Sequence, residues 1–103
     1  MESSVHYNNE RQERCAFIKE CIGEGTVIDS FIVDRGHPGG AEIHSVTDTG
    51  VIIIHNQKTN KLITELIARP EQLRRLYRSE SRAVPSRILS LAYKHNLAAY
   101  NEV

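Results

Sequence analysis

The side chains in this sequence that could carry chemistry gather between residues 31 and 69. They are three histidines, a threonine and an arginine: His37, His44, His55, Thr64 and Arg69. An imidazole changes its proton occupancy near neutral pH, a guanidinium group binds two phosphate oxygens at once, and a hydroxyl adds one more donor. Cleavage of RNA without a metal needs a base, an acid and cations. A metal-independent ribonuclease site drawn from these five residues is therefore one hypothesis.

A simpler interpretation of these residues competes with catalysis. His44 and His55 can be solvent-facing strand residues, and Thr64 belongs to a strand that favours β-branched side chains. We prefer this interpretation because no lysine or second arginine lies within the core of the predicted sheet to partner the histidines. A zinc site that combines the histidines with Asp34 matches no familiar ligand spacing. We therefore expect no metal and no cofactor.

A second set of candidates would bind a partner without catalysing a reaction. It joins the loop DRGHPGG to the arginines that follow the last predicted strand: Asp34, Arg35, His37, Arg69, Arg74, Arg75 and Arg78. Arginines on a helix can contact phosphate groups, and such contacts weaken steeply with salt. Asp34 and Arg35 also have a structural interpretation, in which the pair pins the glycine-rich loop at the end of a strand. Both roles stay open for these two residues.

The elements that position these residues follow from the spacing of apolar side chains. An asparagine at position 8 or 9 and an apolar stripe from Cys15 to Ile22 predict an N-terminal helix that ends at Gly23. Pro70 and Pro85 are typical first residues of helices, so we expect two C-terminal helices. β-Branched runs predict four strands joined by short turns, at 26–34, 41–47, 51–55 and 61–68.

These predictions describe one α+β domain over residues 1–103, with residues 1–8 flexible. The N-terminal helix comes first, then a four-stranded antiparallel sheet arranged as a meander, and then two C-terminal helices. The strand at 51–55, VIIIH, is apolar on both faces. This pattern indicates a central strand that is covered on both sides, or one face of a homodimer.

Charge is spread unevenly along the chain. Residues 1–68 hold 6 Lys/Arg and 10 Asp/Glu, a net −4, whereas residues 69–103 hold 7 and 3, a net +4. A basic surface is one mark of nucleic-acid binding, although the C-terminal helices could simply have solvated basic faces. No apolar run approaches the roughly 18 residues of a membrane span, and no secretory signal is recognisable. We expect no membrane partner and a cytosolic location.

Two resemblances extend this picture. The predicted order of elements over residues 9–69 resembles the barnase–EndoU–colicin–RelE group of small ribonucleases, which implies His44, Thr64 and Arg69 as catalytic candidates. The phrases FIVDRGHPGGAEIHSVTDTGVIIIHN and KLITELIARPEQLRRLY and the ending LAYKHNLAAYN are similar to small uncharacterised proteins of phages and mobile elements in Gram-positive gut bacteria. This second resemblance implies a bacterial host cell and no particular activity.

The leading hypothesis is a small phage or mobile-element protein that binds and modulates a host macromolecule, for example an inhibitor of a CRISPR effector. Its partner would be a host protein or a protein–RNA complex, with phosphate contacts through Arg74, Arg75 and Arg78. A metal-independent ribonuclease is the alternative. The two differ in one respect, because only the enzyme needs His44 and Thr64 to face the same pocket.

Overall fold

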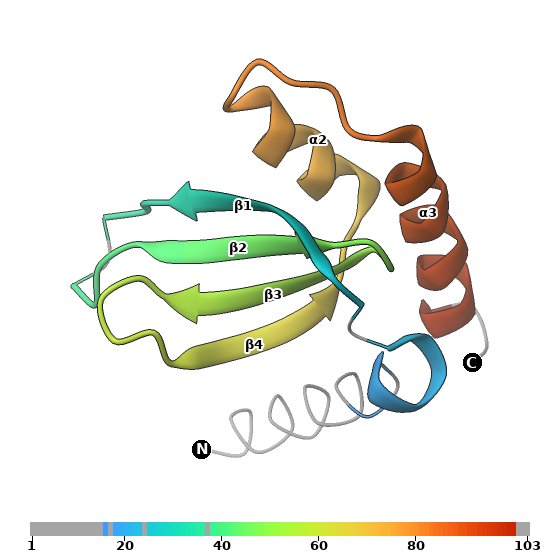
Figure 1. The fold of residues 1–103 in the computed structure, drawn as a ribbon, viewed down its shortest axis with the longest axis horizontal. Coiled ribbons are helices and arrows are strands. Elements are labelled where there is room, and N and C mark those ends of the chain that lie inside the picture. The colour runs from blue at the N-terminus through green and yellow to red at the C-terminus, as the bar shows by residue number, and fades with distance from the viewer. Residues whose placement is uncertain (1–15, 17, 24, 37, 101–103) are drawn as a thin grey trace.

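The structure, a computed structural model, describes residues 16, 18–23, 25–36 and 38–100. Its elements are the π-helix η1 (Ile18–Ile22), the strands β1 (Val27–Val33), β2 (Glu42–Thr47), β3 (Val51–Asn56) and β4 (Leu62–Ile67), and the helices α2 (Pro70–Arg78) and α3 (Ser86–Tyr100). The domain is α+β, and its four strands precede both α-helices (Figure 1). In the part of the chain that the structure describes, no helix is long and apolar enough to cross a membrane.

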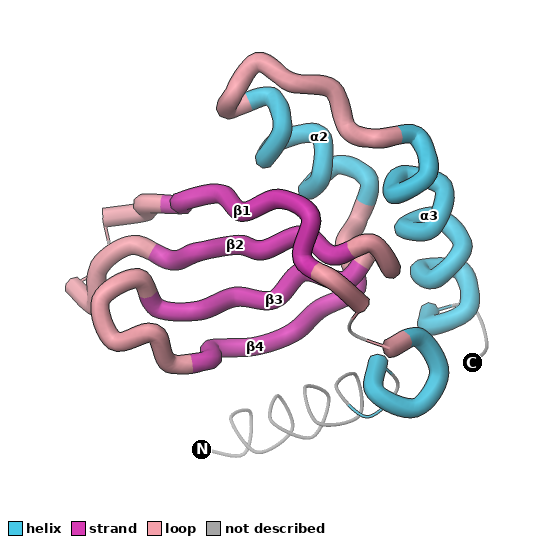
Figure 2. The backbone as a smooth tube through the Cα atoms, in the orientation of Figure 1, coloured by secondary structure: helices cyan, strands magenta, loops and turns pink. Residues whose placement is uncertain are grey.

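The four strands form one antiparallel sheet in the order β1-β2-β3-β4, so each strand pairs with its neighbour in sequence (Figure 2). Short turns permit this meander, because antiparallel neighbours need only a tight hairpin. β3 lies between β2 and β4 and its apolar residues Val51, Ile52 and Ile54 are buried within this chain. The central-strand interpretation of VIIIH therefore accounts for its pattern without a second copy.

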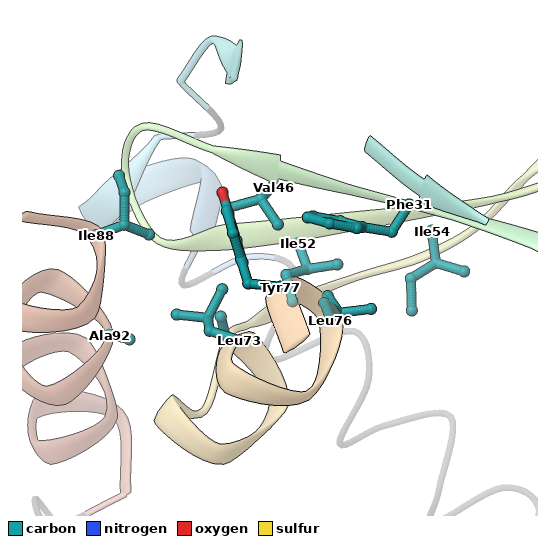
Figure 3. Close-up of a cluster of buried hydrophobic side chains, with 10 residues drawn as sticks. Phe31, Val46, Ile52, Ile54, Leu73, Leu76, Tyr77, Ile88 and Ala92 are labelled. Carbon is teal, nitrogen blue, oxygen red and sulfur yellow. The ribbon is translucent and has the colours of Figure 1, made fainter. Parts of the chain in front are cut away.

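The helices α2 and α3 cover one face of the sheet (Figure 3). Strand residues and helix residues meet there in a single buried cluster, which includes Phe31, Val46, Ile52, Ile54, Leu73, Leu76, Tyr77, Ile88 and Ala92. The α2 members recur at spacings of three and four, which places them on one side of the helix. Tyr77 meets Phe31 edge to face, with ring centroids 4.8 Å apart. This packing holds α2 against the sheet.

A polar network ties β1 to α2 and to the connector that follows it. The Tyr77 hydroxyl donates a hydrogen bond to Asp29, and Arg82 donates to the other oxygen of the same carboxylate at 2.9 Å. Burial raises the pKa of Asp29, but the hydrogen bonds from Tyr77 and Arg82 and the charge of Arg82 outweigh it, so the pKa lies below its ordinary value. Burial and the bond to Asp29 both raise the pKa of Tyr77.

The predicted N-terminal helix is wrong. Its described residues form only the five-residue π-helix η1, which is closed by a hydrogen bond from Gly23 N to Ile18 O; the remainder of the predicted span lies outside the described residues apart from Ala16. Residues four apart nearly line up in this wider i→i+5 turn. Ile18 and Ile22 can therefore both pack against Val51 and Ile67 on the second face of the sheet. Apolar spacing of three and four cannot distinguish this turn from an α-helix.

The turn between β2 and β3 contacts elements on both sides of it. Asp48 Oδ1 accepts a hydrogen bond from Thr26 N at 2.9 Å, and the Thr49 hydroxyl donates to Gly23 O at 3.0 Å. Gly50 has a φ of 84°, a backbone conformation that favours glycine. A Cβ at Gly50 would lie 3.4 Å from Ala92 N of α3. The turn is thus packed between the start of β1 and α3.

Candidate functional site

Among the predicted site residues that the structure describes, His44 of β2 is the most deeply buried, with 2% of its surface exposed. Its ring Nε2 lies 3.0 Å from Oε1 of Glu42. Side chains two apart on a strand point to the same face, so the β-strand itself sets this pair. Among the described residues no group hydrogen-bonds the other ring nitrogen, Nδ1, which is also buried. The imidazole is therefore fixed through one nitrogen and retains bonding capacity at the second.

His44 lines a cavity of about 530 Å³ beside α2, which we call the His44 cavity. The other lining residues come from β1, from the loop after it and from α2: Ile32, Val33, Arg35, Arg69, Glu71, Gln72, Arg75, Leu76 and Ser79. Three arginines and one glutamate are the charged members of this set. The charged residues of the cavity lining are thus mostly cationic. The lining also includes the His44 imidazole, whose Nδ1 has no hydrogen-bond partner among the described residues.

The start of α2 adds to the positive potential of this cavity. Arg69 is the N-cap residue and has an extended backbone, with no side-chain hydrogen bond that caps the helix. The first backbone N–H groups of a helix have no partner within it, and the helix dipole places partial positive charge there. Pro70 has no N–H, so Glu71 and Gln72 supply the first amides, and both residues line the cavity. An anion in the cavity would lie near these donors.

The predicted catalytic triad does not share this cavity as a whole. His44 and Arg69 line it, whereas Thr64 is not among the lining residues. His44 and Thr64 do lie in one cross-strand row, but Ile54 of β3 separates them. With strands about 4.8 Å apart, the two backbones are roughly 10 Å from each other. The Thr64 hydroxyl donates instead to the backbone oxygen of Glu65 at 3.3 Å.

His55 is on the other face of the sheet. It pairs with Ile43, whereas His44 pairs with Ile54, and paired residues in an antiparallel sheet point to the same side. Two of the histidines that the sequence groups together are therefore divided by the sheet. Within the described ranges, no three His, Cys, Asp or Glu side chains come together in a way that could hold a metal ion.

The three residues predicted in the loop after β1 differ in their contacts. Arg35 lines the His44 cavity. The Asp34 carboxylate accepts a hydrogen bond from Gly36 N at 2.9 Å, which stabilises the turn after β1. No ion pair joins Asp34 to Arg35 in the described part of the chain, so the proposed pinning of the loop uses the Asp34 side chain and the backbone. His37 lies outside the described residues.

The remaining predicted arginines lie along the exposed side of α2. Arg74 and Arg78, together with Glu71 and Arg75, line a shallow hollow of about 270 Å³ next to the His44 cavity. Glu71 and Arg75 line both, so the two hollows form one continuous surface. Arg74 also donates a hydrogen bond to the Tyr93 hydroxyl at 3.3 Å, which fixes one end of this surface against α3.

Sequence reasoning missed Glu42 as the partner of His44. The signal was present, because a glutamate two residues before a histidine on one strand must share its face. It placed Arg74, Arg75 and Arg78 on the helix that begins at Pro70, without locating the cavity that Arg35, Arg69 and Arg75 line. No family model matches the chain, and no curated protein or solved structure was found to match it. The two resemblances given above therefore stay predictions.

Proposed function

We propose that this protein binds a nucleic-acid partner through the phosphate-facing arginines of α2 and of the loop after β1. The observation that carries the proposal is the convergence of Arg35, Arg69 and Arg75 on the His44 cavity. Guanidinium groups gathered on one surface repel each other, and an anion relieves that repulsion. In the residues that the structure describes, no carboxylate forms an ion pair with Arg35 or Arg75. A phosphate would supply negative charge with the geometry that the planar guanidinium group prefers.

The surface extends well beyond a single phosphate. Arg74 and Arg78 continue the cationic surface along α2 from the cavity, and both side chains are exposed. We call Arg74, Arg75 and Arg78 the arginine strip. A row of cations of this kind fits a polymer with regularly spaced phosphates better than an isolated small anion. We therefore favour RNA, or a protein–RNA complex that presents it, over a purely protein partner.

The biological setting of this proposal comes from the sequence resemblance to phage and mobile-element proteins. The protein would act in the cytosol of a bacterial host and modulate a host macromolecule, for example as an inhibitor of a CRISPR effector. Binding of the effector's RNA would be sufficient for such a role, and no reaction is required. A homodimer remains a separate hypothesis. Three of the four apolar residues of β3, Val51, Ile52 and Ile54, are buried within one chain, so these three are not available for its interface.

Salt-dependent binding tests this function. A labelled single-stranded RNA is titrated with protein in EDTA at several salt concentrations, and its anisotropy is measured. The parent should bind with a steep salt dependence. In the double variant Arg75→Ala/Arg78→Ala, the slope of the logarithm of the affinity against the logarithm of the salt concentration should fall by about 0.7 for each phosphate that these arginines neutralise in the parent. Lys58→Ala with Lys61→Ala is the matched control, because these exposed cations lie in the β3–β4 turn. Equal weakening in both double variants, or binding that ignores salt, would contradict the proposal.

A metal-independent ribonuclease is the second candidate, and the His44–Glu42 pair favours it. A carboxylate 3.0 Å from an imidazole can orient that ring and balance its charge during proton transfer. Arginines beside the pair could stabilise a phosphorane. RNA incubated with the parent protein in EDTA should then be cut, and His44→Gln should abolish the cutting. Intact RNA that stays bound to the parent protein would exclude the enzyme and leave the binding function standing.

A further inference from the structure

We propose that the His44 cavity holds the phosphate monoester at one end of a nucleic-acid strand, and that His44 distinguishes this end group from the diesters of the backbone. This inference rests on the proposed function, which concerns the arginine strip of α2. It adds a specificity that the strip alone cannot provide. Surface arginines contact the phosphates of any strand, whereas a cavity lined by a buried imidazole can select one kind of phosphate.

The first argument is the bonding state of His44. The side chain is almost wholly buried, and Nδ1 has no hydrogen-bond partner among the described residues. A buried polar atom without a partner destabilises the folded chain, because its hydrogen bonds to water have been lost and not replaced. Because His44 lines the cavity that Arg35 and Arg75 also line, an anionic ligand seated there would lie beside these two guanidinium groups and beside the ring whose Nδ1 lacks a partner.

The second argument is the proton that such a contact needs. The Glu42 carboxylate accepts from Nε2, so Nε2 carries a hydrogen and Nδ1 of a neutral ring presents a lone pair. A diester has no proton to donate, and its oxygens would face that lone pair. A monoester ionises a second time near pH 6, so it can donate its P–O–H hydrogen to a neutral ring. A monoester dianion can instead accept a hydrogen from a doubly protonated ring.

The third argument is charge and size. The cavity lining holds three arginines, Arg35, Arg69 and Arg75, against one carboxylate, Glu71, and this excess of cations favours the more highly charged monoester over a diester. The Glu42 carboxylate balances the ring when His44 is protonated. A volume of about 530 Å³ lies within the usual range of ligand pockets, about 300–1,000 Å³, and has room for a phosphate with part of its nucleotide. The first amides of α2 add donors of the kind that phosphates use.

The test compares one oligoribonucleotide in three forms: unphosphorylated, 5′-phosphorylated and 3′-phosphorylated. Anisotropy gives the dissociation constant of each form for the parent protein. We expect one phosphorylated form to bind about tenfold more tightly than the unphosphorylated form, which corresponds to the satisfaction of a buried polar atom. A nucleoside monophosphate and inorganic phosphate are added as competitors. If the cavity binds a strand end, neither competitor should displace the oligonucleotide at a comparable concentration.

Two histidine variants locate the effect. His44→Gln retains an amide near the position of Nε2, where it can still meet Glu42, and removes Nδ1. It should bring the ratio between phosphorylated and unphosphorylated strands to about one. His55→Gln makes the same change on the opposite face of the sheet and should keep the parent ratio. Glu71→Gln removes the one carboxylate that the described residues contribute to the cavity lining, and should tighten binding of the phosphorylated strand about fivefold.

The outcomes separate the inference from the proposed function. If the parent binds all three forms equally with a steep salt dependence, the strand-end inference is overturned and the nucleic-acid function survives. If no form binds, both fall. If a nucleoside monophosphate competes as well as the phosphorylated strand, the cavity takes a mononucleotide and the assignment to a strand end is wrong. The comparison of ligands uses the parent protein alone, so it holds even if His44→Gln fails to fold.

Discussion

Replacement of Tyr77 by phenylalanine isolates the hydrogen bond that joins α2 to β1. The variant keeps the ring, its edge contact with Phe31 and its place in the core, and loses only the hydroxyl that donates to Asp29. A hydrogen bond to a charged group contributes about 1.5–3 kcal/mol. Asp29 keeps its bond to Arg82, and its side chain is 19% exposed to solvent. We therefore expect the lower end of that range, a decrease of about 1.5 kcal/mol in the free energy of unfolding.

The assay is urea unfolding followed by circular dichroism, at neutral and at acidic pH. A carboxyl group whose folded-state pKa is depressed adds stability at neutral pH, and this stability is lost as the pH falls through the folded-state pKa. For Asp29 this happens below its ordinary pKa of 3.8. The difference between Tyr77→Phe and the parent should therefore shrink in acid, where Asp29 becomes protonated in both proteins.

Tyr93→Phe is the matched control for this experiment. Tyr93 is half exposed, and its hydroxyl only accepts a bond from Arg74 at 3.3 Å. Its removal should change the free energy of unfolding by less than about 0.5 kcal/mol. Equal effects of the two variants, or a Tyr77→Phe effect that is the same in acid as at neutral pH, would refute the assignment of stability to the Asp29 bond.

Two further predictions concern the packing of α3. Gly50→Ala should destabilise the protein by about 2 kcal/mol, because Gly50 has a positive φ and the new Cβ would also lie 3.4 Å from Ala92 N. Gly36→Ala is the control: Gly36 also has a positive φ but open space around it, so its replacement should cost only about 1 kcal/mol. Equal urea midpoints for the two variants would contradict this prediction. Burial and the charge of Lys94 lower the pKa of His95 below 6.5, against a backbone hydrogen bond with Thr49. The unfolded chain then binds more protons, so stability should fall as the pH drops below 6.5, and His95→Gln should flatten that slope in unfolding curves measured across this range.

The strands could be predicted from the sequence because their signals are local. Runs rich in β-branched residues and the turn at 48–50 define β2 and β3 within a few positions. Pro70 fixes the start of α2, and the spacing of Leu73, Leu76 and Tyr77 fixes its buried side. Each of these signals operates over a distance of one turn or one strand, which a sequence displays directly.

The site could be predicted only in part because it depends on contacts between distant residues. Asp29 meets Tyr77 and Arg82 across 48 and 53 residues of chain, and no spacing rule connects them. His44 and Thr64 fall in one row, as residue parity allows, yet the intervening strand keeps them apart. Parity determines the face on which a side chain lies, but not how many strands separate it from another. The position of α2 over the sheet, which creates the His44 cavity, is set by tertiary packing and not by a local sequence signal.

The turn at 47–50 has a practical consequence for anyone who engineers this protein. It bonds to Thr26 and Gly23 on one side and approaches α3 on the other, so an inserted tag or fluorophore loop would force these parts of the chain away from each other. The β3–β4 turn is different, since residues 57–60 are exposed. The Asn56 side chain accepts hydrogen bonds from Lys58 N and Thr59 N within the turn, and the turn also bonds to the neighbouring loop through Gln57 N and Ala41 O. A binding reporter placed there would leave both the core and the arginine strip untouched.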